Sequence, residues 1–198
     1  MDILDVGYRS THYYLLVYHR VKLLFDAGWP GTMPEMKKSF AQHGLSVKDV
    51  DYVLISHYHI DHAGMAQDLK DKGAKLIVME NQTNLNIPER WIRDVVYHPA
   101  REEGNIHLKF ADSRAFLHKL GIEGEIIRTR GHGEDHVTLV LDAGIAFTGD
   151  LPPPNGTEPG SEAEKDWERL RSLKAKRVFP AHGAFDIPLD DVTSGDAR

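Results

Sequence analysis

The sequence predicts a mixed α/β (α+β) fold, a four-layer αββα sandwich that residues 1–198 form as a single domain. Three observations support this prediction. Apolar strand-like runs alternate with amphipathic helical segments. The strand-first pattern of the opening third returns in the last third, which indicates two similar halves. The length suits one domain with a sizeable core, and no linker-like segment divides the chain.

The first half of the chain is predicted to contain strands that are rich in Val, Leu, Ile, Tyr and Phe and that end in turn residues. These strands cover residues 2–7, 13–19, 21–28, 50–56 and 74–80. Helices are expected over 34–44, with Pro34 in the first turn, and over 62–73, each ended by a glycine. The pattern weakens over 81–103, which we interpret as a connecting region with a short helix.

The second half repeats this style. Its strands are expected over 124–131, 136–144, 144–150 and 177–183. A turn at 142–144 joins the second strand of this set to the third. Helices are predicted over 111–121, with Asp112 or Ser113 as the N-cap, and over 161–176.

The composition excludes several classes of protein. Lys and Arg number 24 and Asp and Glu 30, and this net charge of −6 argues against a nucleic-acid binder that relies on phosphate attraction. There is no cysteine, hence no disulfide, thiolate ligand or thiol nucleophile. We see no signal peptide and no apolar run of membrane-spanning length, so a cytoplasmic protein is expected. The polar end, 190–198, is expected to fray.

The segment "HYHIDH" at residues 57–62 concentrates ligand-type side chains at the end of a predicted strand. His57 and His59 point the same way only if the backbone is extended, which fits a loop that leaves the strand. Asp61 and His62 lie where the chain turns into the next helix, so both can face the same site. Imidazole and carboxylate ligands suit Zn²⁺, with Mn²⁺ and Fe²⁺ as alternatives.

Further ligands are expected from elsewhere, because one short segment cannot fill two coordination spheres. Three candidates share its context, a strand end followed by a glycine or a turn. His132 lies in "TRGHGEDH", Asp150 ends "IAFTGD", and His182 ends "VFPAH". Five histidines and two aspartates suffice for two metal ions that share one carboxylate.

The order of these motifs resembles the metallo-β-lactamase-fold hydrolase superfamily. "HYHIDH" matches its His-x-His-x-Asp-His motif, the later His, Asp and His follow in the same order, and "LLFDAGWPG" and "FTGDLPPP" resemble other recurring stretches. The resemblance implies that one metal ion is held by three histidines and the other by a second trio, with Asp150 as the bridge. The first trio is His57, His59 and His132, and the second is Asp61, His62 and His182. Asp26 occupies the family's position for an aspartate behind the ligands.

Other histidines and aromatic residues are not expected to bind the metal ions directly. His12, His19, His43, His98, His107 and His118 are expected to be surface or satisfied core residues. His136, four residues after His132, is the candidate for a hydrogen bond behind the ligands. Trp29 and Tyr58 flank the motifs, and we expect them in the wall of a substrate pocket, whereas Trp91 suits either a pocket or ordinary packing.

The expected reaction is hydrolysis of an ester, thioester or lactone in a dinuclear site, by attack of a metal-bridging hydroxide. The metal ions lower the pKa of bound water, so no serine or cysteine nucleophile is needed. Asp61 is the expected catalytic residue, which orients the nucleophile and moves its proton. A small molecule is the expected substrate, with no nucleic-acid or membrane partner, and the oligomeric state stays open.

Several alternatives remain at this point. The same fold supports phosphodiesterases and nucleases, but neither a basic surface nor an RNA-gripping arm is evident. A β-lactamase of promiscuous activity, a mononuclear iron enzyme resembling a persulfide dioxygenase, and a non-catalytic metal-binding protein are further options. The likeness to glyoxalase II and lactonases is broad. Sixteen residues follow His182, where a glyoxalase II carries a helical domain, so glutathione thioester specificity is not expected.

Overall fold

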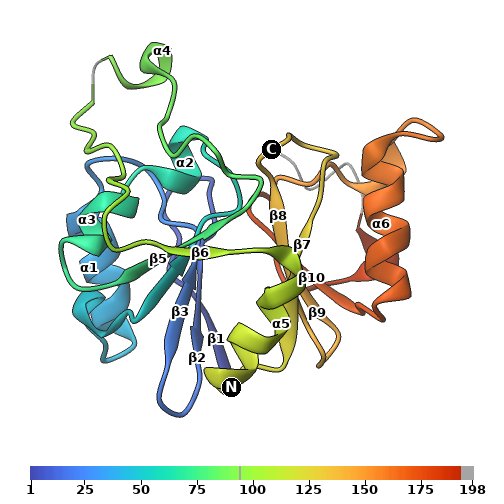
Figure 1. The fold of residues 1–198 in the computed structure, drawn as a ribbon, viewed down its shortest axis with the longest axis horizontal. Helices are drawn as coiled ribbons and strands as arrows, with labels where there is room; N and C mark the ends of the chain where they lie inside the picture. The colour runs from blue at the N-terminus through green and yellow to red at the C-terminus, as the bar shows by residue number, and fades with distance from the viewer. Residues whose placement is uncertain (94, 193–198) are drawn as a thin grey trace. The chain divides into compact units, whose positions relative to one another are not determined.

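The computed structural model describes residues 1–93 and 95–192. Within it the chain divides into two compact units. Unit 1 comprises Met1–Val78 and Gln82–Leu108, and unit 2 comprises Met79–Asn81 and the chain from Lys109 onward. Each unit contains one β-sheet and its own helices (Figure 1). Of the end expected to fray, 193–198 lies outside the described residues.

Unit 1 is built on a six-stranded sheet in the order β1-β2-β3-β4-β5-β6. Its strands are β1 (Asp2–Asp5), β2 (Tyr14–Val17), β3 (Lys22–Phe25), β4 (Tyr52–Leu54), β5 (Lys75–Met79) and β6 (Ile106–Leu108). The first three form an antiparallel meander, and β3, β4 and β5 run parallel. The carboxyl ends of β3 and β4 therefore lie at the same edge of the sheet.

The helices of unit 1 are mostly short. They are α1 (Met33–Gln42), the 3-10 helix η1 (Val47–Asp49), α2 (Ile60–Ala63), α3 (Ala66–Lys70) and α4 (Glu89–Ile92). The prediction of one helix over 62–73 is wrong, because the chain breaks between α2 and α3. The Gly64 N–H donates to Gly28 O at 2.8 Å, and a Cβ on Gly64 would collide with that oxygen. This close backbone approach lies at the break between α2 and α3 and holds the end of α2 against the loop after β3.

Unit 2 is built on a five-stranded sheet in the order β11-β10-β9-β8-β7. Its strands are β7 (Gly124–Arg128), β8 (Val137–Leu141), β9 (Ile145–Gly149), β10 (Arg177–Pro180) and β11 (Ile187–Pro188). Its helices are α5 (Phe110–Lys119), α6 (Glu162–Ser172) and the 3-10 helices η2 (Pro154–Gly156) and η3 (Leu189–Asp191). Strands β7, β8 and β9 form an antiparallel meander, and β10 pairs parallel to β9.

The two units follow the same plan, which confirms the predicted mixed α/β class with two similar halves. In each, an antiparallel meander is followed by a helix that crosses over to a strand parallel to the last strand of the meander. Because β7, β9 and β10 run in one direction, their carboxyl ends share an edge of the unit 2 sheet. Each predicted metal ligand follows a strand end of this kind. Each unit also has its own apolar core.

Two further sets of local predictions need correction or extension. Neither Asp112 nor Ser113 caps α5, since the N-cap position is Lys109 and no side chain caps it. Ser113 is instead buried, and its hydroxyl donates to Phe110 O at 2.8 Å and accepts from Ile126 N at 3.1 Å. The short edge strands β6 and β11 were not predicted, because so few residues show no periodicity. No helix in the described part of the chain has the length and apolarity to cross a membrane.

Candidate metal centre

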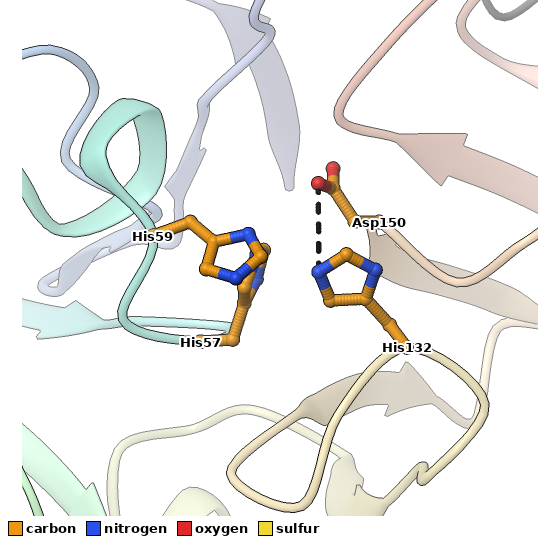
Figure 2. Close-up of side chains that lie close together, drawn as sticks. All are labelled: His57, His59, His132 and Asp150. Carbon is orange, nitrogen blue, oxygen red and sulfur yellow. Dashed lines mark ion pairs between the residues drawn. The ribbon is translucent and has the colours of Figure 1, made fainter. Parts of the chain in front are cut away.

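In unit 1 the predicted ligands gather in the loop and helix that follow β4. We call His57, His59, Asp61 and His62 the unit 1 cluster. The rings of His57 and His59 lie with centroids 4.3 Å apart, and those of His57 and His62 lie 4.1 Å apart (Figure 2 draws the first pair). His57 and His62 are fully buried. His59 is the N-cap residue of α2, so the first turn of this helix brings Asp61 and His62 close to His57 and His59.

Asp26, at the carboxyl end of β3, lies behind this cluster and orients His62. Its backbone is in the left-handed region, with φ of +67°, a conformation that Asp tolerates better than most residues. Its buried carboxylate accepts a hydrogen bond from His62 Nδ1 at 2.8 Å. It also accepts from Ser56 N at 2.7 Å and Ser56 Oγ at 2.9 Å. With the Nδ1 proton held by Asp26, the lone pair of His62 lies on Nε2.

Ser56 extends the same control to a second imidazole, and the sequence reasoning missed it. Its hydroxyl oxygen lies 2.9 Å from His57 Nδ1. Because the hydroxyl donates its own hydrogen bond to Asp26, it accepts a hydrogen bond from the Nδ1–H of His57. The lone pair of His57 therefore also lies on Nε2. A signal for Ser56 was present, since it directly precedes the motif at the end of the strand.

Asp61 is held by a chain of two donors from outside the motif. The Thr11 hydroxyl donates to Asp61 Oδ2 at 3.0 Å, and Trp29 Nε1 donates to the Thr11 hydroxyl at 3.2 Å. Thr11 is buried, with 1% of its surface exposed. Sequence reasoning did not find Thr11, because it lies fifty residues before Asp61 in a stretch without a motif. The hydrogen bond to Oδ2 therefore fixes the orientation of the Asp61 carboxylate.

Aromatic side chains flank the unit 1 cluster. Trp29, His59, Asp61 and Trp91, together with Ile60, line one pocket. The Trp91 ring lies edge-on to His59, with centroids 4.7 Å apart and planes at 90°.

The expectation for Tyr58 is not met, because its side chain packs in the core of unit 1 with 4% of its surface exposed. The chain bends at His57 and again at His59, and the side chain of Tyr58 between them packs with the apolar residues of unit 1.

In unit 2 the predicted ligands are His132, after β7, Asp150, after β9, and His182, after β10; we call them the unit 2 cluster. One carboxylate oxygen of Asp150 lies 3.8 Å from His132 Nε2, the pair joined by the dashed line in Figure 2. The other oxygen lies 3.2 Å from His182 Nε2. The Asp150 carboxylate thus presents one oxygen to each imidazole, and all three side chains are partly exposed.

His136 lies behind this cluster. It is fully buried, and its ring centroid is 5.5 Å from that of His132. Its Nδ1 forms a hydrogen bond of 2.7 Å with the Thr129 hydroxyl, which in turn contacts the Thr138 hydroxyl at 2.9 Å. The ring of His136 therefore packs behind the loop that carries His132, and its hydrogen-bonding role behind the ligands stays a prediction.

Helix α6 anchors the loops of the unit 2 cluster. The Asp166 carboxylate accepts from Gly131 N at 2.7 Å, directly before His132. Burial raises the pKa of Asp166 above its usual value, while the backbone donors of Gly131 and Arg130 oppose that rise. Trp167 Nε1 donates to Pro152 O at 2.7 Å, two residues after Asp150. Two successive residues of one helix thereby hold the loops that carry His132 and Asp150.

The ligand chemistry of both clusters suits divalent ions of the zinc type. All seven predicted ligands belong to groups of side chains that could hold a metal ion, and they offer imidazole nitrogen and carboxylate oxygen only. Several other histidines instead contact carboxylates near them: His12 contacts Asp5, His98 contacts Asp68 and His118 contacts Glu123.

Each of the two sheets carries histidines and aspartates at the carboxyl ends of its strands, in groups that could hold metal ions. Consistent with this, the family model of the metallo-beta-lactamase superfamily matches residues 6–182. The chain belongs to this superfamily. A solved metallo-beta-lactamase family protein from Thermus thermophilus has a similar fold, with a TM-score of 0.72, 19% identity, and coverage of 92% of this chain and 73% of that one.

Curated relatives are similar over most of this chain. A beta-lactamase-like protein 2 homolog of Drosophila melanogaster is 25% identical over 88% of this chain and 59% of its own length. An atrochrysone carboxyl ACP thioesterase of Aspergillus fumigatus is 28% identical over 89% of this chain and 51% of its own length. A probable metallo-hydrolase of Bacillus subtilis is 22% identical over 81% and 63%, respectively. The chain thus spans about half to three fifths of the length of these relatives.

Proposed function

We propose that this protein is a dinuclear metal-dependent hydrolase that cleaves an ester, a thioester or a lactone. The observation that carries the proposal is the Asp150 carboxylate, which presents one oxygen to His132 and the other to His182. A carboxylate in that position is suited to bridge two cations, each with an imidazole beside it.

In this proposal His57, His59 and His132 hold one ion, and Asp61, His62 and His182 hold the other. The ordering of the imidazoles supports it. Ser56 and Asp26 hold Nδ1 of His57 and His62, so Nε2 carries the lone pair that a metal ion requires. Zinc is the expected metal, with manganese or iron as alternatives.

When bound, the ions would supply a water molecule of lowered pKa and would polarise the scissile carbonyl. Asp61 would orient that water and accept its proton. The Thr11 hydroxyl, which accepts a hydrogen bond from Trp29, donates to one oxygen of the Asp61 carboxylate, so the carboxylate would keep a fixed orientation during the reaction. Trp29 and Trp91 would exclude bulk water at the edge of the site.

Two features favour a neutral acyl substrate. Apart from the candidate ligands, the residues that line the pockets beside both clusters carry no charge, and the nearby Arg9 and Arg90 lie over the rings of Trp29 and Trp91. One relative is named as an acyl carrier protein thioesterase, which is an acyl hydrolase. We propose that the substrate is a small molecule and that the enzyme has no nucleic-acid or membrane partner. We further propose that the chain forms one domain and acts in the cytoplasm.

Metal analysis combined with a substrate panel tests the proposal. The panel contains p-nitrophenyl esters, a homoserine lactone, a thioester, bis-p-nitrophenyl phosphate and nitrocefin. We expect two zinc equivalents per chain and the highest kcat/KM on an ester, thioester or lactone. His182→Ala should lose activity, whereas His118→Ala, a matched change at an exposed histidine, should keep it.

Either of two results would overturn the proposal. One equivalent of metal or less after metal-replete purification would contradict the dinuclear site. Turnover of the phosphodiester with inert esters, thioesters and lactones would replace the acyl hydrolase by a phosphodiesterase.

A further inference from the structure

Unit 2 contains an apolar cavity that begins at the unit 2 cluster. Its volume is about 230 Å³, and His132, Asp150 and His182 form its polar end. Beyond them it is lined by Leu151, Pro152, Trp167, Val178, Ile187 and Val192. The cavity is partly open to solvent and has room for several water molecules. A small ligand could therefore enter it without opening the core.

The side chains of the cavity wall favour a hydrocarbon chain over a polar ligand. Among the described residues that line it, those outside the polar end carry no charged side chain. Its one side-chain donor beyond the cluster, Trp167 Nε1, is already used by Pro152 O at 2.7 Å. A polar group placed deep in the cavity would lose its water without gaining a partner, which is costly. A methylene chain would lose nothing and gain apolar contact.

We propose that this cavity binds the acyl chain of the substrate, which makes the enzyme selective for medium-chain acyl esters or thioesters. The inference rests on the proposed hydrolase function, because the reacting carbonyl must lie at the unit 2 cluster for its chain to enter. If each methylene takes roughly the 30 Å³ of a water molecule, the cavity holds about six to eight carbons. The leaving group, which is polar in a thioester of a carrier protein, stays outside the apolar wall.

The first test varies chain length. On p-nitrophenyl esters, kcat/KM should rise by about threefold to fourfold per added methylene up to about eight carbons, and then level off or fall. A series of acetate esters in which only the alcohol is lengthened should show no such rise in kcat/KM. An equal rise in the alcohol series, or a flat acyl series, would overturn the acyl assignment.

The second test fills the cavity. Val192, 8% exposed, lines the cavity, and Val192→Phe should shorten the preferred chain by about two carbons, because a phenyl ring takes the volume of about two extra methylenes. Ile187→Phe repeats the test if the first variant folds poorly. Val96→Phe is the matched control, since Val96 is 71% exposed and belongs to unit 1. An unchanged optimum in both filled variants would overturn the proposal.

A binding measurement separates this inference from the proposed function. Calorimetry on the metal-loaded protein should show octanoate binding at least tenfold more tightly than acetate, with the difference lost in Val192→Phe and kept in Val96→Phe. If no ester, thioester or lactone is hydrolysed but this pattern appears, the hydrolase proposal fails and the hydrocarbon pocket stands. If hydrolysis occurs while octanoate and acetate bind equally, the hydrolase stands and the pocket is overturned.

Discussion

At the scale of single residues, the site depends on side chains that hold the ligands as much as on the ligands. Asp26, Ser56 and Thr11 are buried, and each forms a hydrogen bond with a predicted ligand. Asp26 accepts from His62, Ser56 accepts from His57, and Thr11 donates to Asp61. A buried polar group keeps its orientation because losing its partner costs about 1–3 kcal/mol. These three residues therefore set tautomer and carboxylate orientation before any substrate arrives.

Thr11 provides a direct test of that idea. Thr11→Val keeps the shape but removes the hydroxyl that donates to Asp61, and we expect kcat to fall by about tenfold with KM within about twofold. Thr11→Ser should stay near the wild type. For comparison, Asp61→Asn removes the proton acceptor itself and should lower kcat by about a hundredfold or more.

Steady-state kinetics on the best ester, with metal content measured on each variant, checks these values. A Thr11→Ser enzyme as impaired as Thr11→Val would assign the effect to packing of the methyl group. Unchanged turnover in Asp61→Asn would remove its role in proton transfer.

At the scale of elements, strand ends place the ligands and helices hold the loops between them. The loop before His132 lies against α6 so closely that only glycine fits at residue 131. A Cβ there would lie 2.5 Å from Ala163 Cα and 2.7 Å from Ala163 Cβ. Asp166 of the same helix accepts a hydrogen bond from the backbone N–H of Gly131. The position of His132 thus depends on the start of α6, about thirty residues further along the chain.

Gly131→Ala should reveal this dependence. The added methyl forces the loop or α6 to move, so we expect the free energy of unfolding to fall by about 1–3 kcal/mol, together with weaker metal binding. Gly133→Ala is the control, because its Cβ would approach nothing closer than 3.3 Å, and we expect a change within about 0.5 kcal/mol. Urea unfolding and zinc titration measure both effects. Equal values for the two variants would show that the contact with α6 is unimportant.

At the scale of the whole molecule, two units of one plan each bring a set of ligand-type residues to the carboxyl ends of their strands. Neither set alone offers enough ligands for two complete coordination spheres. In the proposed enzyme metal binding would favour the folded state, so added zinc should raise the melting temperature.

Asp150→Ala should be the most damaging single change to metal occupancy. Removing a carboxylate that serves both ions also removes negative charge between two cations, so we expect at most about one metal equivalent in place of two. The melting temperature should then respond less to added zinc. Asp142→Ala, at an exposed aspartate paired with Arg114, is the control and should retain both ions. Elemental analysis decides, and two retained metals with normal activity would show that Asp150 is not the bridge.

Much of this molecule could be predicted from local pattern. The strands of both meanders, helices α1 and α6 and the turn at 142–144 follow from periodicity and turn residues, which act over a few positions. The candidate ligands are readable for the same reason, since each follows a strand end. Predictions failed where a distant contact prevailed over local preference. The helix over 62–73 breaks because Gly64 meets Gly28, and Ser113 is buried against β7 rather than capping α5.

The sequence by itself determined the fold class and the candidate ligands with their order, because strand-end histidines and aspartates are local features. Only the tertiary structure decided which side chains orient them. Thr11 reaches Asp61, Asp26 reaches His62, and α6 reaches the loop before His132. It also decided that Tyr58 faces the core and that a cavity lies beside Asp150. Such contacts join residues far apart in the chain, and no local pattern encodes the distance between them.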